Sequence, residues 1–198
     1  MAASPLAFLL IAAIASATGQ DGPKGTESGQ CAVDTEQMMQ LTPTAFDQDM
    51  NGGWRTLASR SGCEKAAANL IESYIRHNWH RLDQENLHVM YWHEGQMEAI
   101  AGDNHLAIPL LMAGVTPDKR RLDMGFYEYS LGTVAFLNRD LPGLKAARQR
   151  LAALPEPPWF KAEFKGAMAW PANLNVLDGL IRCFDFPYAV AYGDSCPK

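Results

Sequence analysis

The amino-acid sequence predicts an all-α protein that is exported and cross-linked by disulfide bonds. Apolar residues recur every three or four positions through most of the chain, the spacing that places them on one face of a helix. The sequence lacks the long alternating apolar and polar runs that indicate strands. Four cysteines follow an apolar N-terminal run. With 198 residues, the chain is long enough for one hydrophobic core, so we expect a single domain.

The net charge of the chain argues against two classes of binding partner, nucleic acids and anionic membranes. The formal net charge is -5, with 20% charged and 47% hydrophobic residues, as in ordinary globular proteins. A mildly acidic protein lacks the positive field that attracts nucleic acid or anionic membranes. We therefore expect neither of these as a partner.

Residues 1–17 are predicted to be a signal peptide. An uncharged apolar run from position 5 ends in Ala15-Ser16-Ala17, a small-residue pattern at which signal peptides are cleaved. The run is shorter than the roughly 20 residues that cross a bilayer. No lysine or arginine precedes it, so a retained anchor is the alternative. Residues 18–30 are expected to be a disordered N-terminus of the mature protein, before a folded domain at 31–198.

The four cysteines, Cys31, Cys63, Cys183 and Cys196, all lie in the predicted mature chain. An even number of cysteines in an oxidising compartment indicates two disulfide bonds. Three pairings are possible, and the shortest loops favour Cys31–Cys63 with Cys183–Cys196. Free buried thiols are the alternative, and zinc is less favoured because no two cysteines have the Cys-x2-Cys spacing.

Periodicity predicts one long helix followed by three helix pairs, each pair joined by a short polar turn: 63–82, then 87–101 with 106–113, 126–137 with 142–154, and 174–184 with 188–192. An insertion at 154–172 is rich in proline and aromatic residues. Phe160, Phe164 and Met168 would share one helical face in it. The insertion is expected either to cap the core or to present an apolar surface to a partner.

The three helix pairs contain a faint repeat. Each has a glycine in its first helix, an aspartate near the turn, and a third residue twelve positions after the glycine: Gly95, Asp103 and Ala107; Gly132, Asp140 and Leu144; Gly179, Asp185 and Ala191. A glycine inside a helix costs about 1 kcal/mol relative to alanine. Three glycines at equivalent positions therefore indicate that helices approach one another closely there.

This pattern resembles the tetratricopeptide repeat over residues 46–192. The resemblance implies stacked antiparallel helix hairpins that form a right-handed superhelix, whose first helices line a concave groove. The chain departs from the family in its longer intervals between units and in the glutamates at 94 and 98.

The sequence contains one partial metal motif. Asp47-Gln-Asp49-Met-Asn51-Gly52 matches the beginning of an EF-hand loop, but its twelfth position, which needs a glutamate, is Ala58. We therefore interpret the segment as a turn before a helix. The histidines match no zinc motif, although His77 and His80 have helical spacing. Neither a nucleophile elbow nor a phosphate loop occurs, so we predict no metal, no cofactor and no catalytic residue.

Polar and aromatic residues on the first helices are the candidate ligand-binding residues of the groove: Trp92, Glu94, Gln96, Glu98, Glu128, Tyr129, Asp178 and Arg182. Glu94 and Glu98 are spaced i,i+4, as are Asp178 and Arg182, which have opposite charges. The alternative is that these residues form ion pairs that only fix how the helices pack.

These observations favour an exported module, periplasmic or extracellular, that binds a protein segment or a polar ligand in the groove. One alternative is a small hydrolase or lyase in which Glu94 and Glu98 are the general acid and base. Another is a structural domain of the cell envelope that has no ligand. The sequence does not indicate the oligomeric state.

Overall fold

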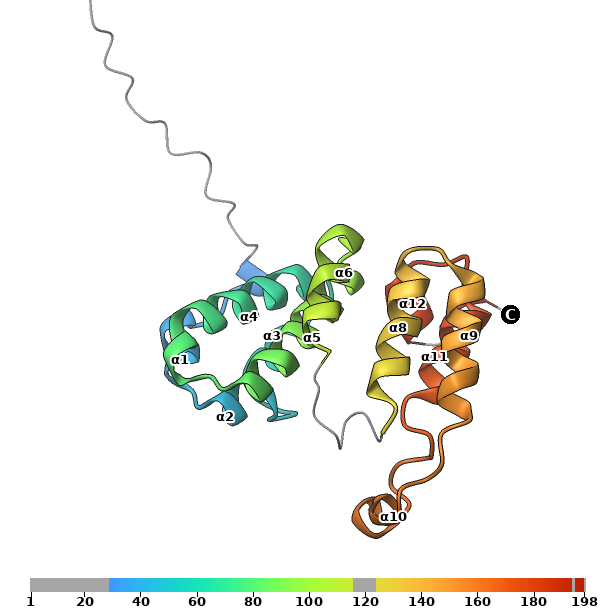
Figure 1. Ribbon diagram of the computed structural model, residues 1–198. Coiled ribbons are helices and arrows are strands. Elements are labelled where there is room, and N and C mark those ends of the chain that lie inside the picture. Colours follow the sequence, from blue (N-terminus) through green and yellow to red (C-terminus); the bar gives the residue numbers. More distant parts are fainter. Residues whose placement is uncertain (1–28, 116–123, 194, 198) are drawn as a thin grey trace, which may run out of the picture.

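The computed structural model describes residues 29–115, 124–193 and 195–197, and this part of the chain folds into helices with no strand (Figure 1). The predicted all-α class is confirmed. The predicted signal peptide and most of the predicted disordered tail lie outside the described residues; the tail's last two positions begin a 3-10 turn, Gly29–Cys31. Every helix that the structure describes is too short or too polar to span a membrane.

The first half of the molecule consists of three short helices followed by three longer ones: α1 (Thr35–Gln40), α2 (Pro43–Asp47), α3 (Arg55–Ala58), α4 (Glu64–Asn78), α5 (Gln84–Ile100) and α6 (Asn104–Ala113). A 3-10 turn, Trp79–Arg81, connects α4 to the loop before α5. α5 packs against both α4 and α6. The rings of Phe46 and Tyr74 stack with centroids 3.7 Å apart in the core of this half.

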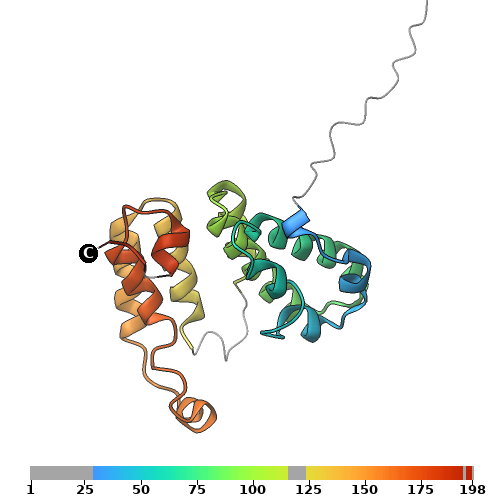
Figure 2. The same cartoon turned by 180° about the vertical axis from the view of Figure 1, so that it is seen from behind.

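The second half has its own core and a projecting insertion: α8 (Phe126–Leu137), α9 (Leu141–Ala152), α10 (Pro158–Phe164), α11 (Leu174–Arg182) and α12 (Tyr188–Tyr192). Figures 1 and 2 show α10 at one end, away from the other helices. Phe160 is buried against Phe164 and Trp170, so the apolar face of the insertion packs mainly on itself. Met168 is exposed.

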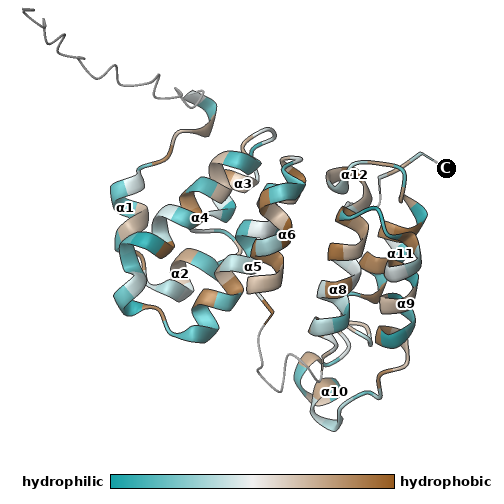
Figure 3. Cartoon of the chain, turned by 45° about the horizontal axis from the view of Figure 1, so that its top comes forward, coloured by the Kyte–Doolittle hydropathy of each residue, from teal (hydrophilic) through white to brown (hydrophobic). Residues whose placement is uncertain are grey.

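The two halves meet where α5 and α6 face α8 and α12. Trp92 of α5 contacts the rings of Phe126 and Tyr129 of α8, with centroids 4.8 and 5.3 Å away. In Figure 3 the helices of both halves carry apolar stretches beside polar ones, as amphipathic helices do. Aromatic side chains therefore form much of the contact between the halves.

The repeated glycines of the helix pairs correspond to close helix packing at two positions. A Cβ atom on Gly95 would lie 2.9 Å from the Leu111 backbone nitrogen and 3.1 Å from the Ala107 carbonyl oxygen, so α5 and α6 touch there. A Cβ atom on Gly132 would lie 2.7 Å from a Leu177 methyl group of α11. The predicted close approach is confirmed at both glycines, although Gly132 faces the next helix pair and not its own partner. The superhelical arrangement stays a prediction.

Two of the three turn aspartates cap the helix that follows. Asp103 accepts a hydrogen bond from the Leu106 backbone N–H at 3.1 Å, and Asp140 accepts one from the Gly143 N–H at 2.9 Å. Asp185 does not cap α12, whose N-cap residue is Pro187. The aspartate of the repeat thus caps the following helix in the first two pairs and not in the third.

Both favoured disulfide pairings are present. Cys31–Cys63 joins the first 3-10 turn to the start of α4, with Cα atoms 5.4 Å apart. Cys183–Cys196 joins the end of α11 to the C-terminal segment across 5.6 Å. Oxidised pairs of this kind are consistent with an extracellular location.

Candidate functional site

Helix α5 brings two groups of polar side chains to different flanks of the first half. Glu94 faces a pocket between α4, α5 and α6. The preceding residue, His93, contacts Asp47 of α2 and Arg55 of α3. Successive residues of a helix point about 100° apart, which is why neighbouring side chains reach different surroundings.

The pocket between α4, α5 and α6 has a volume of about 270 Å³. Its lining combines apolar side chains with two carboxylates and one guanidinium: Glu72, Ile75, Arg76, Tyr91, Glu94 and Leu110. Arg76 donates to Glu72 at 2.8 Å within α4, and both side chains are largely exposed. The charges of α4 at the pocket therefore neutralise each other.

Glu94 differs from the other carboxylates near the pocket because its side chain has no hydrogen-bond or ion-pair partner among the described residues. Glu94 is 7% exposed, and no hydrogen bond or ion pair joins its side chain to another part of the described chain. Glu98, one turn further along α5, is also buried but accepts a hydrogen bond from Lys65 Nζ at 2.6 Å. Lys65 Nζ also lies 3.6 Å from Asp103 Oδ2. The two glutamates that the sequence pairs are thus held in unlike environments.

Burial raises the pKa of Glu94 to about 7, and the negative charges of Glu72 and Glu98 add to the shift. The positive charges of Lys65 and Arg76 act in the opposite direction. A carboxyl group with such a pKa exchanges its proton near neutral pH. It is suited either to bind a cation in place of the proton or to transfer the proton.

Three of the predicted groove residues lie in the contact between the halves. Trp92, Gln96 and Tyr129 are buried, whereas the groove prediction expected them to be exposed. Gln96 Nε2 donates to the Tyr129 hydroxyl at 3.4 Å across the contact. In this structure the three side chains face each other and hold α5 against α8.

The remaining predicted residues lie in the second half, away from Glu94, and two of them form ion pairs with arginines of α9. Glu128 pairs with Arg150 at 2.7 Å. Asp178 accepts two hydrogen bonds from Arg148, at 2.8 and 3.2 Å. Arg182 is exposed near the end of α11. The structure therefore brings Glu94 and Glu98 together but places the other groove residues in separate contacts.

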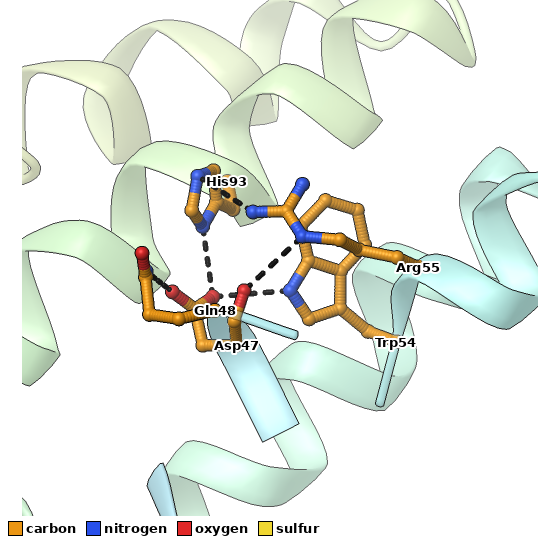
Figure 4. Close-up of polar contacts among 5 residues, drawn as sticks. All are labelled: Asp47, Gln48, Trp54, Arg55 and His93. Atoms are coloured by element: carbon orange, nitrogen blue, oxygen red, sulfur yellow. Dashed lines mark hydrogen bonds and ion pairs between the residues drawn. The ribbon is translucent and has the colours of Figure 1, made fainter. Parts of the chain in front are cut away.

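A second polar group, which sequence reasoning missed, centres on Asp47 (Figure 4). Asp47 is 2% exposed, and its Oδ1 accepts from Trp54 Nε1 at 3.0 Å and from His93 Nδ1 at 2.8 Å. Gln48 Nε2 donates to the other carboxylate oxygen. Burial by itself raises the pKa of Asp47, but the hydrogen bonds from His93, Trp54 and Gln48 outweigh it and lower the pKa.

The segment that matches the start of an EF-hand is a turn, as predicted. Both oxygens of Asp47 accept from side chains of the protein, and Asp49 accepts from the Asn51 backbone N–H at 2.9 Å. Gly53 has φ +51, and a Cβ atom there would lie 1.8 Å from the Phe46 carbonyl oxygen. No group of three or more histidine, cysteine, aspartate or glutamate side chains that could hold a metal occurs within the described ranges.

Arg55 completes the second group. Its guanidinium lies 4.3 Å from the centroid of the Trp54 ring, its Nε donates to the Asp47 carbonyl oxygen at 3.2 Å, and its Nη2 is 3.5 Å from His93 Nε2. Because a guanidinium only donates, this contact assigns the proton of neutral His93 to Nδ1, which faces Asp47. Burial lowers the pKa of Arg55, and Asp47 and Tyr192 of α12 partly offset this effect.

Asp47 and His93 lie 46 residues apart in the sequence. The partial EF-hand motif that contains Asp47 does not include a histidine, and His93 belongs to no recognised motif. Only the packing of α2 and α3 on α5 brings them together, so no local pattern could have identified the pair.

Comparisons of this chain with protein-family models, with curated proteins and with solved structures gave no significant match.

Proposed function

We propose that this protein is an exported interaction module that binds a cationic side chain of a protein segment, a lysine or an arginine, in the pocket between α4, α5 and α6. One observation carries the proposal: the Glu94 carboxyl is buried at the pocket and has no cationic partner among the described residues. Nearby Glu98 has such a partner in Lys65.

The chemistry of the pocket suits a long cationic side chain. A buried carboxylate without a partner is costly, and an incoming ammonium or guanidinium group removes that cost by pairing with it. Ile75, Tyr91 and Leu110 offer apolar surface for the methylene stem of a lysine or arginine. A pocket of about 270 Å³ fits one side chain better than a folded partner, so the segment would place one residue in it.

Export of the module is part of the proposal. The apolar N-terminal run with its small-residue end supports it from the sequence. Two disulfide bonds, both within the chain, support it from the structure. Glu94 is the only candidate groove residue in the proposed binding pocket. The rest of the pocket is lined by Tyr91 of α5 and by residues of α4 and α6.

A peptide titration tests the proposal. Two short labelled peptides that differ only at a central lysine or norleucine are titrated with the oxidised protein, and binding is followed by fluorescence anisotropy. At pH 8, where Glu94 is ionised, we expect the lysine peptide to bind at least tenfold more tightly. At pH 5.5 the preference shrinks because Glu94 holds a proton.

Glu94→Gln removes the charge and keeps the shape of the side chain, so the preference for lysine should disappear. The matched control is Glu128→Gln, a carboxylate paired with Arg150 in the other half, which should keep the preference. Equal binding of the two peptides, or a lysine preference that survives Glu94→Gln, would refute the proposal.

Acid–base catalysis is a second candidate, favoured by the unlike environments of two adjacent carboxylates. Glu94 would donate a proton to a leaving group, while Glu98, paired with Lys65, would be the base. The test is turnover of chromogenic glycoside and ester substrates. Product that forms with the native protein but with neither Glu94→Gln nor Glu98→Gln would establish it, and absence of turnover would reject it.

A further inference from the structure

Arg55 is held in a fixed orientation on the flank of α5 that faces away from the Glu94 pocket. It stacks on Trp54 and donates through Nε to the Asp47 carbonyl oxygen (Figure 4). These two contacts fix the plane of the guanidinium and leave its Nη2 directed at His93. A planar donor fork held in this way binds a carboxylate or a phosphate with little loss of side-chain entropy.

Arg55 forms no salt bridge with a carboxylate within the described part of the chain. Five other lysine or arginine side chains of the described residues have carboxylate partners: Lys65 with Glu98, Arg76 with Glu72, Arg139 with Asp185, Arg148 with Asp178, and Arg150 with Glu128. The Asp47 carboxylate raises the pKa of Arg55 through its charge. Its oxygens accept from Trp54, His93 and Gln48, and the guanidinium donates to the Asp47 backbone carbonyl oxygen instead.

The pKa values of a paired arginine and of Arg55 shift in opposite directions. The hydrogen bond from Arg148 to Asp178 raises the pKa of Arg148. Burial, in contrast, lowers the pKa of Arg55, and the charges of Asp47 and Tyr192 offset this effect only in part. An anion that binds beside such a half-buried cation stabilises its charged form.

His93 is oriented to assist. Its Nδ1 donates to Asp47, which fixes the imidazole ring with Nε2 toward Arg55. In neutral His93 this Nε2 accepts from Arg55 Nη2 at 3.5 Å, which helps to fix the orientation of the guanidinium. Tyr192 of α12 lies close enough to influence the charge of Arg55, so the cluster lies at the junction of the two halves.

From this geometry we infer a second ligand site, in which the Arg55 guanidinium, oriented by Trp54, the Asp47 carbonyl oxygen and His93, binds an oxyanion, a carboxylate or a phosphate. The site is independent of the proposed lysine-binding pocket, since Arg55 and Glu94 act from different flanks of α5.

The test uses the full oxidised chain and two probes, inorganic phosphate and acetate, at pH 6. Sodium chloride at equal ionic strength is the control for screening. The indole N–H signal of Trp54 in ¹H–¹⁵N NMR spectra reports on the cluster, because this group is bound to Asp47 beneath Arg55. We expect a saturable shift with at least one probe and none with chloride; the more effective probe identifies the anion class.

Arg55→Gln should abolish the saturable shift, and Arg55→Lys, which keeps the charge but loses the planar fork, should weaken binding at least fivefold. Arg150→Gln, which removes an arginine that is already paired, should leave the shift unchanged. Glu94→Gln should also leave it unchanged, which separates this site from the lysine pocket. A shift that does not saturate, or one that persists in Arg55→Gln, overturns the inference.

Discussion

Gly53 fixes the path of the chain between α2 and α3, and through it the position of Arg55. Its φ of +51 is a backbone conformation that side chains disfavour, and a Cβ atom would overlap the Phe46 carbonyl oxygen. That oxygen accepts from the Trp54 backbone N–H at 3.3 Å, so the overlap cannot be relieved without breaking the turn.

We expect Gly53→Ala to lower the free energy of unfolding by about 2 kcal/mol or more, because the strain and the overlap add. Urea unfolding followed by circular dichroism measures the change. Gly29→Ala is the matched control, since a Cβ atom there meets nothing within 4 Å. Equal stability of the two variants would contradict the prediction.

Glu94 makes stability depend on pH. Its pKa rises from 4.5 in the unfolded chain to about 7 in the folded protein, so between these values the folded protein binds more protons. The stabilisation that protonated Glu94 provides is present below pH 4.5 and is lost as the pH rises through 7.

Glu94→Gln cannot ionise, so we expect it to match the native protein in stability at pH 4.5 and to exceed it by about 3 kcal/mol at pH 8. Urea unfolding of both proteins across this range gives the difference. A difference that stays constant with pH would show that Glu94 does not titrate in the folded protein.

At the scale of helices, the packing glycines of α5 and α8 have different neighbours. Gly95 faces backbone atoms of α6, which cannot move without shifting the helix, whereas Gly132 faces the flexible end of Leu177. We expect Gly95→Ala to destabilise the protein by about 1–3 kcal/mol through overpacking.

Gly132→Ala should be nearly neutral, because a gain in helix propensity of about 1 kcal/mol offsets a small movement of Leu177. Thermal unfolding of the two variants side by side measures their order. The reverse order would mean that the second half is packed more rigidly than the first.

Much of the helical structure could be predicted because its causes are local. Apolar periodicity located α5, α6, α8, α9 and α11. The short helices α1 and α2 were not predicted, since they span only one or two turns and give little periodic signal. Short loops also favoured both disulfide pairings, which the structure contains.

The candidate site was less predictable because it depends on contacts between distant segments. Glu94 was identified from its place on an apolar helix, but its lack of a partner follows from Lys65 reaching Glu98 instead. Trp92 and Tyr129 were expected in a groove and are buried, because aromatic residues at helix contacts and in open grooves have the same sequence pattern.

At the scale of the whole molecule, each half depends on one disulfide bond. The bond Cys31–Cys63 spans 32 residues and Cys183–Cys196 spans 13. Loop entropy gives about 4 kcal/mol for the first and about 3 kcal/mol for the second.

We therefore expect Cys31→Ser with Cys63→Ser to lower the urea midpoint more than Cys183→Ser with Cys196→Ser does. Each double variant leaves the other bond intact and serves as the comparison for it. A larger loss from the C-terminal pair would show that its contribution is not mainly loop entropy.

The whole of α12 lies inside the loop that Cys183–Cys196 closes. A five-residue helix is far too short to persist alone in water, so it depends on this covalent closure and on burial of Tyr188. Selective reduction of that bond should let α12 detach while the remaining helices stay folded, and amide hydrogen exchange at residues 188–192 should then accelerate. The junction between the halves, and with it Tyr192 beside Arg55, would thus be intact only in oxidising surroundings. Unchanged exchange after reduction would show that packing alone retains the helix.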